Sequence, residues 1–347
     1  MRERIIILGI FNNKYFNSEV FAQYLESVPR VKQDALVKAG VLRSRPDLAT
    51  SLVDGVGGSY LSVPMAGRIG GEALNYDGTT SIEAEGIDGY QQSMIVVGRM
   101  KAWQEKDFTK DLTGKDFMEV IAAQVANYWD EVDAKTMLAT LKGIFGVSAF
   151  ATAHTLDISS ETVNAVGATT LNSAIAKAAG DNKKTFTCAI MHSTVATNLE
   201  NLEVLEYRKQ TDANGIQREI GLADWNGRTV LIDDDMPTED ASGSTKYTTY
   251  ILGEGAFDYV NCGAAVPSEV WRDPNTNGGV DRLITRQRKI YAPRGFSFVQ
   301  PTSGAAIVSP TDEQLETAAR WAVVKSANGT GLFPSKAIPF ARIISKG

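Results

Sequence analysis

A glycine-rich segment between two strand-like segments places the strongest constraint on how this chain can fold. Tyr60–Pro64 and Met94–Trp103 both alternate in the manner of β-strands, and Ala66–Gln92 lies between them with six glycines and few aliphatic residues. A segment of this composition buries too little apolar surface to offset the entropy lost when it becomes ordered. Two strands alone are also only marginally stable. We therefore expect a protruding β-ribbon that becomes ordered by packing on a neighbouring copy of the chain.

The first fifty residues predict an extended arm with short helical pieces. Apolar residues recur at helical spacing in 16–25 and 31–42, but they are too few to form a core, so the arm must lie on something else. The apolar opening, Ile5–Phe11, is far shorter than the roughly 18 residues that span a bilayer, and no small-residue cleavage site follows it. Cys188 and Cys262 predict small buried side chains in a reduced compartment, with no disulfide framework.

The strongest helix prediction covers Lys115–Lys142, with Thr113 as its N-cap and apolar residues at a 3.6-residue period. Short strands and helices then alternate, including a buried strand at Phe186–Met191 and a helix that begins at Ser193 and runs through Leu205. A capping box of Thr311 and Gln314 predicts a further helix, which runs through Ala322.

These elements indicate an α+β fold with five parts. The predicted parts are an arm at 1–50, the ribbon with flanking strands at 51–104, the long-helix unit at 105–150, a mixed α/β lobe at 151–279, and a return strand followed by a C-terminal helix and strand at 280–347.

The order of these parts resembles the HK97-like plan of bacteriophage major capsid proteins, which consists of an N-arm, an E-loop, a spine helix, an A-domain and a P-domain. Leu222–Pro237 resembles the strand, acidic turn and proline of the A-domain, and Tyr250–Phe257 resembles the strand that follows there. Arg282–Arg286 and Gly295–Phe298 are similar to the strand that returns to the P-domain. The resemblance covers nearly the whole chain, and it depends on the order of the segments rather than on any single motif.

The resemblance implies a structural subunit, not an enzyme and without cofactors, that assembles into hexamers and pentamers of an icosahedral shell around double-stranded DNA. Its implied location is the virion capsid, and the host cytoplasm during assembly. The implied partners are other copies of the chain, a portal, a decoration protein, and packaged DNA through weak non-specific contact. The short arm leaves no room for a large fused scaffolding domain, so a separate or already cleaved scaffolding protein is expected.

Contacts between subunits are expected at apolar residues of the arm and ribbon and at arginines of the return strand. These residues are Phe11, Tyr15, Phe16, Tyr60, Leu61, Ile82, Ile87, Tyr90, Met94, Val96, Arg282, Arg286 and Arg288. The arginines alternate along a strand, which favours ion pairs between subunits over DNA contact. The net charge of −6 likewise argues against a protein that mainly grips nucleic acid.

Two groups of residues raise the question of bound metal or catalysis. Asp233, Asp234 and Asp235 are weak candidates for a divalent cation, but a calcium site needs about six to eight oxygens, and we favour a solvated turn. His192–Ser193 and His154 suggest a nucleophile pair, but no nucleophile-elbow motif surrounds Ser193, which we expect to cap a helix instead.

Two other functions compete with the phage shell. An encapsulin-like compartment shares the fold and encloses cargo enzymes, although the arm is a poor match to the cargo-binding helix of that family. An α/β hydrolase or transferase with a glycine-rich lid is the second rival, and it predicts a small oligomer with a convergent polar pocket.

Overall fold

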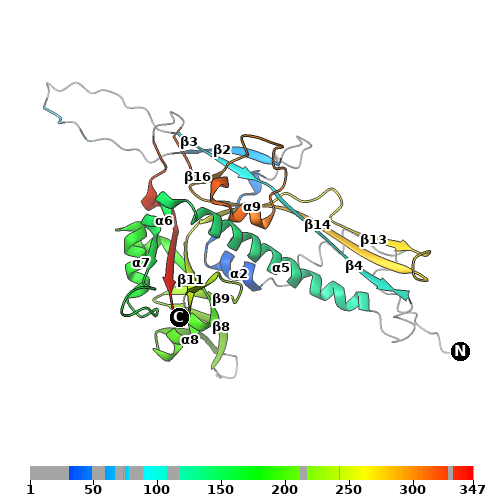
Figure 1. Ribbon diagram of the computed structural model, residues 1–347, viewed down its shortest axis with the longest axis horizontal. Coiled ribbons are helices and arrows are strands. Elements are labelled where there is room, and N and C mark those ends of the chain that lie inside the picture. The colour runs from blue at the N-terminus through cyan, green and yellow to red at the C-terminus, as the bar shows by residue number, and fades with distance from the viewer. Residues whose placement is uncertain are drawn as a thin grey trace.

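The computed structural model describes residues 31–48, 59–66, 73, 75–77, 89–107, 117–211, 217–241, 243–326 and 331–346. One long helix lies between the two larger sheets, and this mixture of helix and sheet confirms the α+β class (Figure 1). The long helix is α5, Phe117–Ile144, which agrees with the predicted helix to within two residues at each end. Its 28 residues extend for about 42 Å. The predicted cap Thr113 lies outside the described residues.

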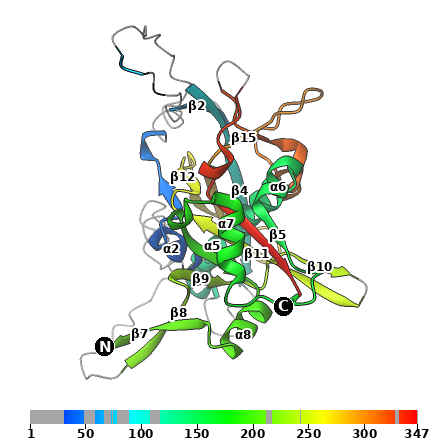
Figure 2. The ribbon, with the colours of Figure 1, turned by 90° about the vertical axis from the view of Figure 1, so that its left-hand side faces the viewer.

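The larger sheet forms a lobe that is covered on both faces. Its strand order is β5 (Thr155–Asp157), β17 (Phe340–Ser345), β11 (Ser244–Gly253), β6 (Phe186–Met191), β9 (Arg228–Ile232), β8 (Gln217–Trp225) and β7 (Leu205–Thr211), with β10 (Thr238–Ala241) paired to β11. The ribbons β7–β8 and β10–β11 project from this lobe on opposite sides (Figure 2).

Alternate residues of the central strands β6 and β11 enter two different cores. Ala189 and Ile251 pack with α7 (Thr170–Ala179) and α8 (Ser193–Asn201), whereas Ile190 and Leu252 pack on the side of α5. Because both faces are covered, the sequence of β6 is apolar except for Thr187 and shows no regular alternation with polar residues.

The smaller sheet contains long strands beside α5. Its order is β1 (Leu42–Ser44), β12 (Phe257–Asn261), β14 (Val280–Pro293) and β13 (Ser268–Asp273), and β4 (Val97–Lys106) pairs with the other edge of β14. The pairing crosses the sequence boundary that we predicted at 279/280, because β12 and β13 join β14 while β17 joins the larger sheet. The short helix α2 (Val31–Lys38) packs on α5.

The predicted strand Met94–Trp103 is in fact two strands in two sheets. β3 (Gly89–Ile95) pairs with β2 (Tyr60–Ala66), and β4 begins at Val97 and pairs with β14. Between them the Val96 amide donates to the carbonyl oxygen of Ser59 (2.7 Å). Four consecutive buried residues, 94–97, mark the change of sheet, because a strand with one covered face would bury only alternate residues.

Two helix predictions run too far toward the C-terminus. α8 ends at Asn201, and Leu202 beyond it is exposed. α9 (Asp312–Glu316) has the predicted capping box, but the chain then forms a 3₁₀ turn at Ala318–Arg320 and the strand β16 (Trp321–Val323), which pairs with β15 (Phe296–Phe298). The indole of Trp321 donates to the carbonyl oxygen of Leu315 (2.7 Å), which fixes this turn against α9.

A close contact at Gly143 holds α9 against α5. A Cβ at this position would lie 2.0 Å from the carbonyl oxygen of Leu315 and 2.4 Å from Nε1 of Trp321, so only glycine fits. We expect Gly143→Ala to lower the free energy of unfolding by about 1–3 kcal/mol, the usual cost of overpacking. Urea unfolding of the dissociated subunit measures this. Gly98→Ala is the control, since a Cβ at Gly98 makes only an ordinary 3.5 Å contact with Ser309. Equal stability of the two variants would contradict the view that only glycine fits at position 143.

Candidate assembly surface

The β2–β3 ribbon is anchored at its base by polar contacts to the segment around β15. The Tyr60 hydroxyl donates to the carbonyl oxygen of Phe298 (2.9 Å), and the buried amide of Gln92 donates to the carbonyl oxygens of Pro293 (2.9 Å) and Phe296 (3.0 Å). The antiparallel register runs from Tyr60 opposite Ile95 to Ala66 opposite Gly89. The chain therefore fixes where the ribbon starts and in which direction it leaves the body.

Part of the expected ribbon contact belongs to the subunit's own core. Tyr90, Met94 and Val96 are 9%, 2% and 2% exposed, and the Tyr90 ring packs edge-on against Phe333 at 5.4 Å. For these three residues the prediction of a subunit contact is wrong, because the base of the ribbon packs against the body of the chain. Tyr60 remains 41% exposed, and Leu61 is half-buried.

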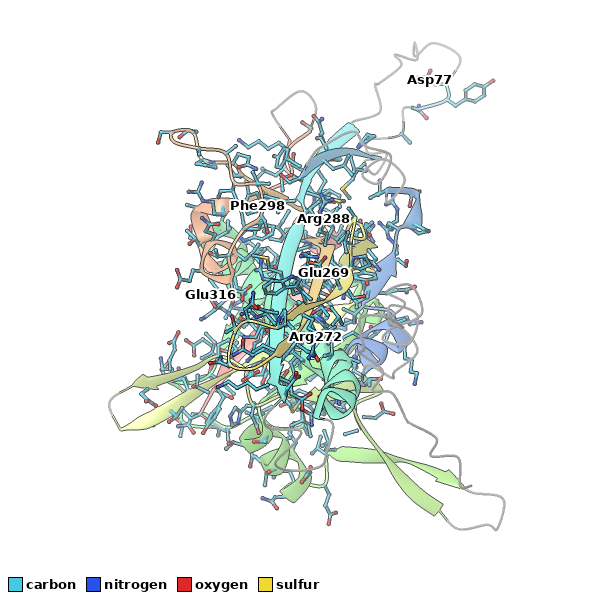
Figure 3. All side chains as sticks on the ribbon, turned by 90° about the vertical axis from the view of Figure 1, so that its right-hand side faces the viewer. Asp77, Glu269, Arg272, Arg288, Phe298 and Glu316 are labelled. Atoms are coloured by element: carbon cyan, nitrogen blue, oxygen red, sulfur yellow. The ribbon has the colours of Figure 1, made fainter. Side chains whose placement is uncertain are left out.

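Several other predicted contact residues cannot be placed. Phe11, Tyr15, Phe16, Ile82 and Ile87 lie outside the described residues. Within the short described segment 75–77, Tyr76 was not among the predicted contacts, although its side chain is 98% exposed, and Figure 3 shows the neighbouring Asp77 far from the body of the molecule. The sequence signal that could have indicated Tyr76 as a contact residue is an aromatic side chain within a glycine-rich segment.

The sheet formed by β4, β14 and β13 has two chemically different faces. In this antiparallel sheet, residues that lie opposite each other share a face, so the register sorts the side chains. Its inner face points at α5, where Leu283 packs with Val125 and Trp129. Trp103 meets Tyr128 edge-on at 5.4 Å on the same side. This inner face closes the subunit's own core.

The opposite face, here called the outer face, carries cationic and apolar side chains in alternation. Its residues are Met100, Ala102, Glu269, Trp271, Arg282, Ile284, Arg286 and Arg288. Met100 is 79% exposed and Trp271 is 48% exposed, and Figure 3 labels Glu269 and Arg288 on this sheet. Aromatic residues, methionine and arginine are the side chains enriched in protein interfaces.

The three predicted arginines all lie on the outer face, but two of them already have partners within the chain. Arg286 pairs with Glu269 (Nη2–Oε1, 2.5 Å), and the guanidinium carbon of Arg282 lies 4.8 Å from the centre of the Trp271 ring. The Arg288 side chain has no hydrogen-bonding or ionic partner in the part of the chain that the structure describes. Of the three, Arg288 is therefore the one with its charge available to another molecule.

The aspartates at 233–235 form a turn with separate contacts. Asp233 is buried and its carboxylate accepts from the amide of Asp235 (3.1 Å), while Asp234 accepts from the amide of Ser193 (3.3 Å). Asp235 lies 3.6 Å from the Lys135 ammonium. Among the described residues, no three histidine, cysteine or acidic side chains are arranged to hold a metal ion.

The two histidines have structural contacts. His192, and not the predicted Ser193, caps α8, because its Nδ1 accepts from the amide of Thr194 (3.1 Å). His154 is buried, and burial lowers its pKa. Its Nδ1 lies 2.7 Å from the carbonyl oxygen of Phe340 and its Nε2 lies 2.7 Å from the hydroxyl of Ser335. A neutral ring that donates from Nδ1 and accepts at Nε2 satisfies both contacts.

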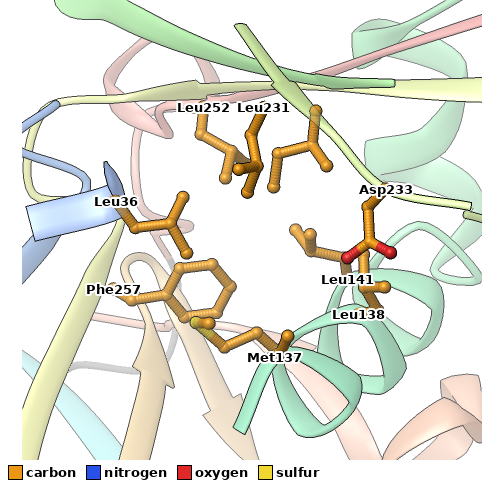
Figure 4. Close-up of a pocket in the computed structure, with 10 residues that line it drawn as sticks. Leu36, Met137, Leu138, Leu141, Leu231, Asp233, Leu252 and Phe257 are labelled. Carbon is orange, nitrogen blue, oxygen red and sulfur yellow. The ribbon is translucent and has the colours of Figure 1, made fainter. Parts of the chain in front are cut away.

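A cavity where α2, α5 and the larger sheet meet is lined almost wholly by apolar side chains, including Leu36, Met137 and Phe257 (Figure 4). Asp233 is its one ionisable lining residue, so the cavity offers no pair of acid and base groups. The two cysteines are also buried, and burial raises the pKa of the Cys188 thiol to about 12. That thiol is therefore a poor nucleophile.

Among the described residues, no single helix is long and apolar enough to cross a membrane. One bent pair, Gln124–Ile144 with Ser148–His154, meets the criteria of length and composition, at an angle of 99°.

Comparison with known proteins agrees with the architecture. No family model matches the chain. The major capsid protein of Bacillus phage SPP1 is 29% identical over 304 residues, which cover 87% of this chain and 90% of that protein. This chain is a phage major capsid protein of the HK97-like fold. It is thus a structural protein of an icosahedral capsid, not an enzyme.

Solved capsid structures share the fold at low sequence identity. The capsid of cyanophage Pam1 matches with a TM-score of 0.56 at 11% identity, over 92% of this chain and 93% of that one. The head structure of Helicobacter pylori bacteriophage KHP40 matches with a TM-score of 0.55 at 12% identity, over 88% and 87% of the two chains. The fold therefore persists in proteins whose sequences differ at most positions.

Proposed function

We propose that copies of this chain form the hexamers and pentamers of an icosahedral shell that encloses double-stranded DNA, and that the ribbon and the outer face are its contact surfaces. The observation that carries this proposal is the outer face, where Met100 and Trp271 are exposed on the same face as Arg288, whose side chain has no ionic partner among the described residues. A monomeric protein gains nothing from exposing these side chains together, whereas a neighbouring copy that covers them gains apolar burial and a charge contact.

The contact residues that we propose are the predicted ones that remain accessible in the subunit, together with those that lie outside the described residues. They are Tyr60, Leu61, Tyr76, Arg282, Arg286 and Arg288, together with Phe11, Tyr15, Phe16, Ile82 and Ile87. Assembly in the host cytoplasm would use a separate scaffolding protein and a portal, and a decoration protein would bind the finished shell. Contact with packaged DNA would be weak, in keeping with the net charge of −6.

The content of the particle tests whether the shell encloses double-stranded DNA. Particles from phage-producing cells are treated with nuclease and then opened, and their nucleic acid and protein are analysed. We expect protected double-stranded DNA, which the nuclease removes once the shell has been opened. Particles that hold a folded enzyme and no DNA would contradict this proposal and favour the encapsulin-like alternative.

Reversing the charge of Arg288 tests the outer face. We expect Arg288→Glu to weaken assembly at least about tenfold, which corresponds to about 1.4 kcal/mol for the contact, because the new carboxylate meets the surface that the guanidinium contacted. Light scattering at increasing subunit concentration measures the effect. Lys101→Glu is the matched control, because Lys101 is an exposed cation on β4, on the opposite face of the same sheet. Assembly that is weakened equally by the two variants would show a general effect of charge.

A further inference from the structure

A recess lies where the two sheets meet, and four separate segments form its wall. They are the turn after α2 (Gly40, Leu42 and Arg43), Lys184 and Thr185, the β11–β12 turn (Glu254 and Gly255), and Arg294 after β14. The Gly255 amide donates to the carbonyl oxygen of Gly40 and the Glu254 amide donates to that of Thr185, both at 2.8 Å. The wall is therefore fixed by the backbone, and we call it the junction recess.

The charges in the junction recess are not balanced within the chain. Arg43 is neutralised by the buried Asp258 through two hydrogen bonds of 2.7 and 3.0 Å. Lys184 and Arg294 have no carboxylate partner within 4.0 Å in the part of the chain that the structure describes. Glu254 is the one carboxylate on the wall. One positive charge is therefore in excess.

Arg294 is the decisive residue of the recess, because its Nε is buried and has no hydrogen-bond acceptor in the part of the chain that the structure describes. A buried donor of a charged group is costly to leave unsatisfied, so native structures that contain one call for an explanation. The backbone around Arg294 is held by its neighbours. The Arg294 amide donates to the carbonyl oxygen of Ala256 (2.8 Å), and the next residue, Gly295, has a φ of 86° and no room for a side chain, because a Cβ there would lie 2.9 Å from Cγ1 of Ile338. The guanidinium of Arg294 is one of the groups that line the junction recess.

We propose that the junction recess is an oxyanion site, and that in the shell a carboxylate from a second copy of the chain occupies it. This rests on the self-assembly proposed above. A single guanidinium with one lysine suits one oxyanion, whereas a DNA backbone presents one charge per roughly 1.7 Å of helix axis and needs an extended basic surface. A second copy offers carboxylates, because the chain has 41 acidic and 35 basic residues.

Zero-length crosslinking tests the proposal directly. A carbodiimide activates a carboxylate, the Lys184 amine attacks it, and an amide forms while the carbodiimide takes up the oxygen as a urea. Shells are assembled from a mixture of subunits with ordinary and with heavy nitrogen, so that a crosslink between copies gives peptides of mixed isotope content. Lys336 and Asp181 lie 3.9 Å apart in one chain and serve as the internal control, which gives unmixed peptides only.

We expect mixed-isotope peptides that contain Lys184 in shells and none in dissociated subunits. In Arg294→Gln the yield of these peptides should fall about tenfold through loss of a charge-assisted hydrogen bond, while Arg294→Lys retains part of it. Lys184 crosslinks confined to one copy, or absent while the Lys336 control reacts, would overturn the proposal.

Two further outcomes separate the alternatives. Lys184→Gln and Arg294→Gln shells of normal yield that package less DNA would mean that the ligand is a DNA phosphate, and the assignment to a carboxylate of a second copy would be wrong. Wild-type protein that forms no shells at all would refute self-assembly itself, and the proposal for the recess would fail with it.

Discussion

Replacing residues 67–88 by an Asn-Gly turn is expected to leave a folded subunit that forms no shells. Ala66 and Gly89 lie opposite each other at the ends of β2 and β3, so a two-residue turn joins the strands without changing their register. The base of the ribbon keeps its contacts through Tyr60 and Gln92, so the core of the subunit loses nothing. The shell, by contrast, loses every contact that the segment makes with neighbouring copies.

Circular dichroism and sedimentation velocity measure the two halves of this prediction. We expect an unchanged unfolding midpoint and the loss of all fast-sedimenting particles. A variant of equal length with 67–88 replaced by glycine and serine separates the effect of length from that of the side chains, and it should fail in the same way. Tyr76→Ser should give an intermediate loss, because Tyr76 is 98% exposed in the subunit. Normal particles from the shortened variant would refute the role given to the ribbon.

Lys289→Met is expected to destabilise the subunit by about 3–5 kcal/mol, the usual cost of breaking a buried ion pair from one side. Lys289 on β14 pairs with Asp133 on α5, and their side chains are 5% and 3% exposed. Gln287 also donates to this carboxylate (2.9 Å). Removing the lysine takes away the ammonium that pairs with this buried carboxylate and leaves the charge of the carboxylate in the core.

Urea unfolding of the dissociated subunit measures the loss, and a double variant provides its control. Lys289→Met with Asp133→Leu removes both charges, and we expect it to be more stable than the single variant because apolar replacement of a buried pair is often neutral. A single variant that loses less than about 1 kcal/mol, or a double variant no more stable than the single one, would contradict the view that this pair holds α5 to the smaller sheet.

The sequence predicted the elements whose signal is local. The long helix follows a 3.6-residue period over many turns, and α5 is found there. Asn226 and Gly227, which join β8 to β9, have φ values of 50° and 76°, a conformation that suits these two residue types. The capping box of Thr311 and Gln314 forms as predicted. In each case neighbouring residues decide the conformation.

The sequence predictions failed where residues far apart in the sequence decide the local conformation. The division of residues 94–103 between two sheets depends on β14, which lies some 190 positions later in the sequence. The helix expected through Ala322 ends early because Trp321 pairs with Phe298 and bonds to Leu315, contacts that no local pattern contains. The same reason explains why Tyr90, Met94 and Val96 were expected at a subunit contact, since apolar residues of a ribbon look alike whether a neighbour or the chain itself covers them.

The candidate site was predicted in part. The alternation along β14 correctly places Arg282, Arg286 and Arg288 on one face. The partners Glu269 and Trp271 lie on β13, a strand that the sequence analysis did not identify, so the internal pairing of two of the three arginines was not foreseen. The orphaned Nε of Arg294 depends on four segments that meet in space, and no pattern in the sequence marks it.

A cryo-electron microscopy map of the assembled particle tests the central claim most directly. In that map we expect neighbouring copies to cover Met100 and Trp271 of the outer face, and residues 67–88 of each copy to lie on another subunit. A particle in which both regions face solvent would contradict the account, as would a protein that stays a 37.5 kDa monomer at every concentration.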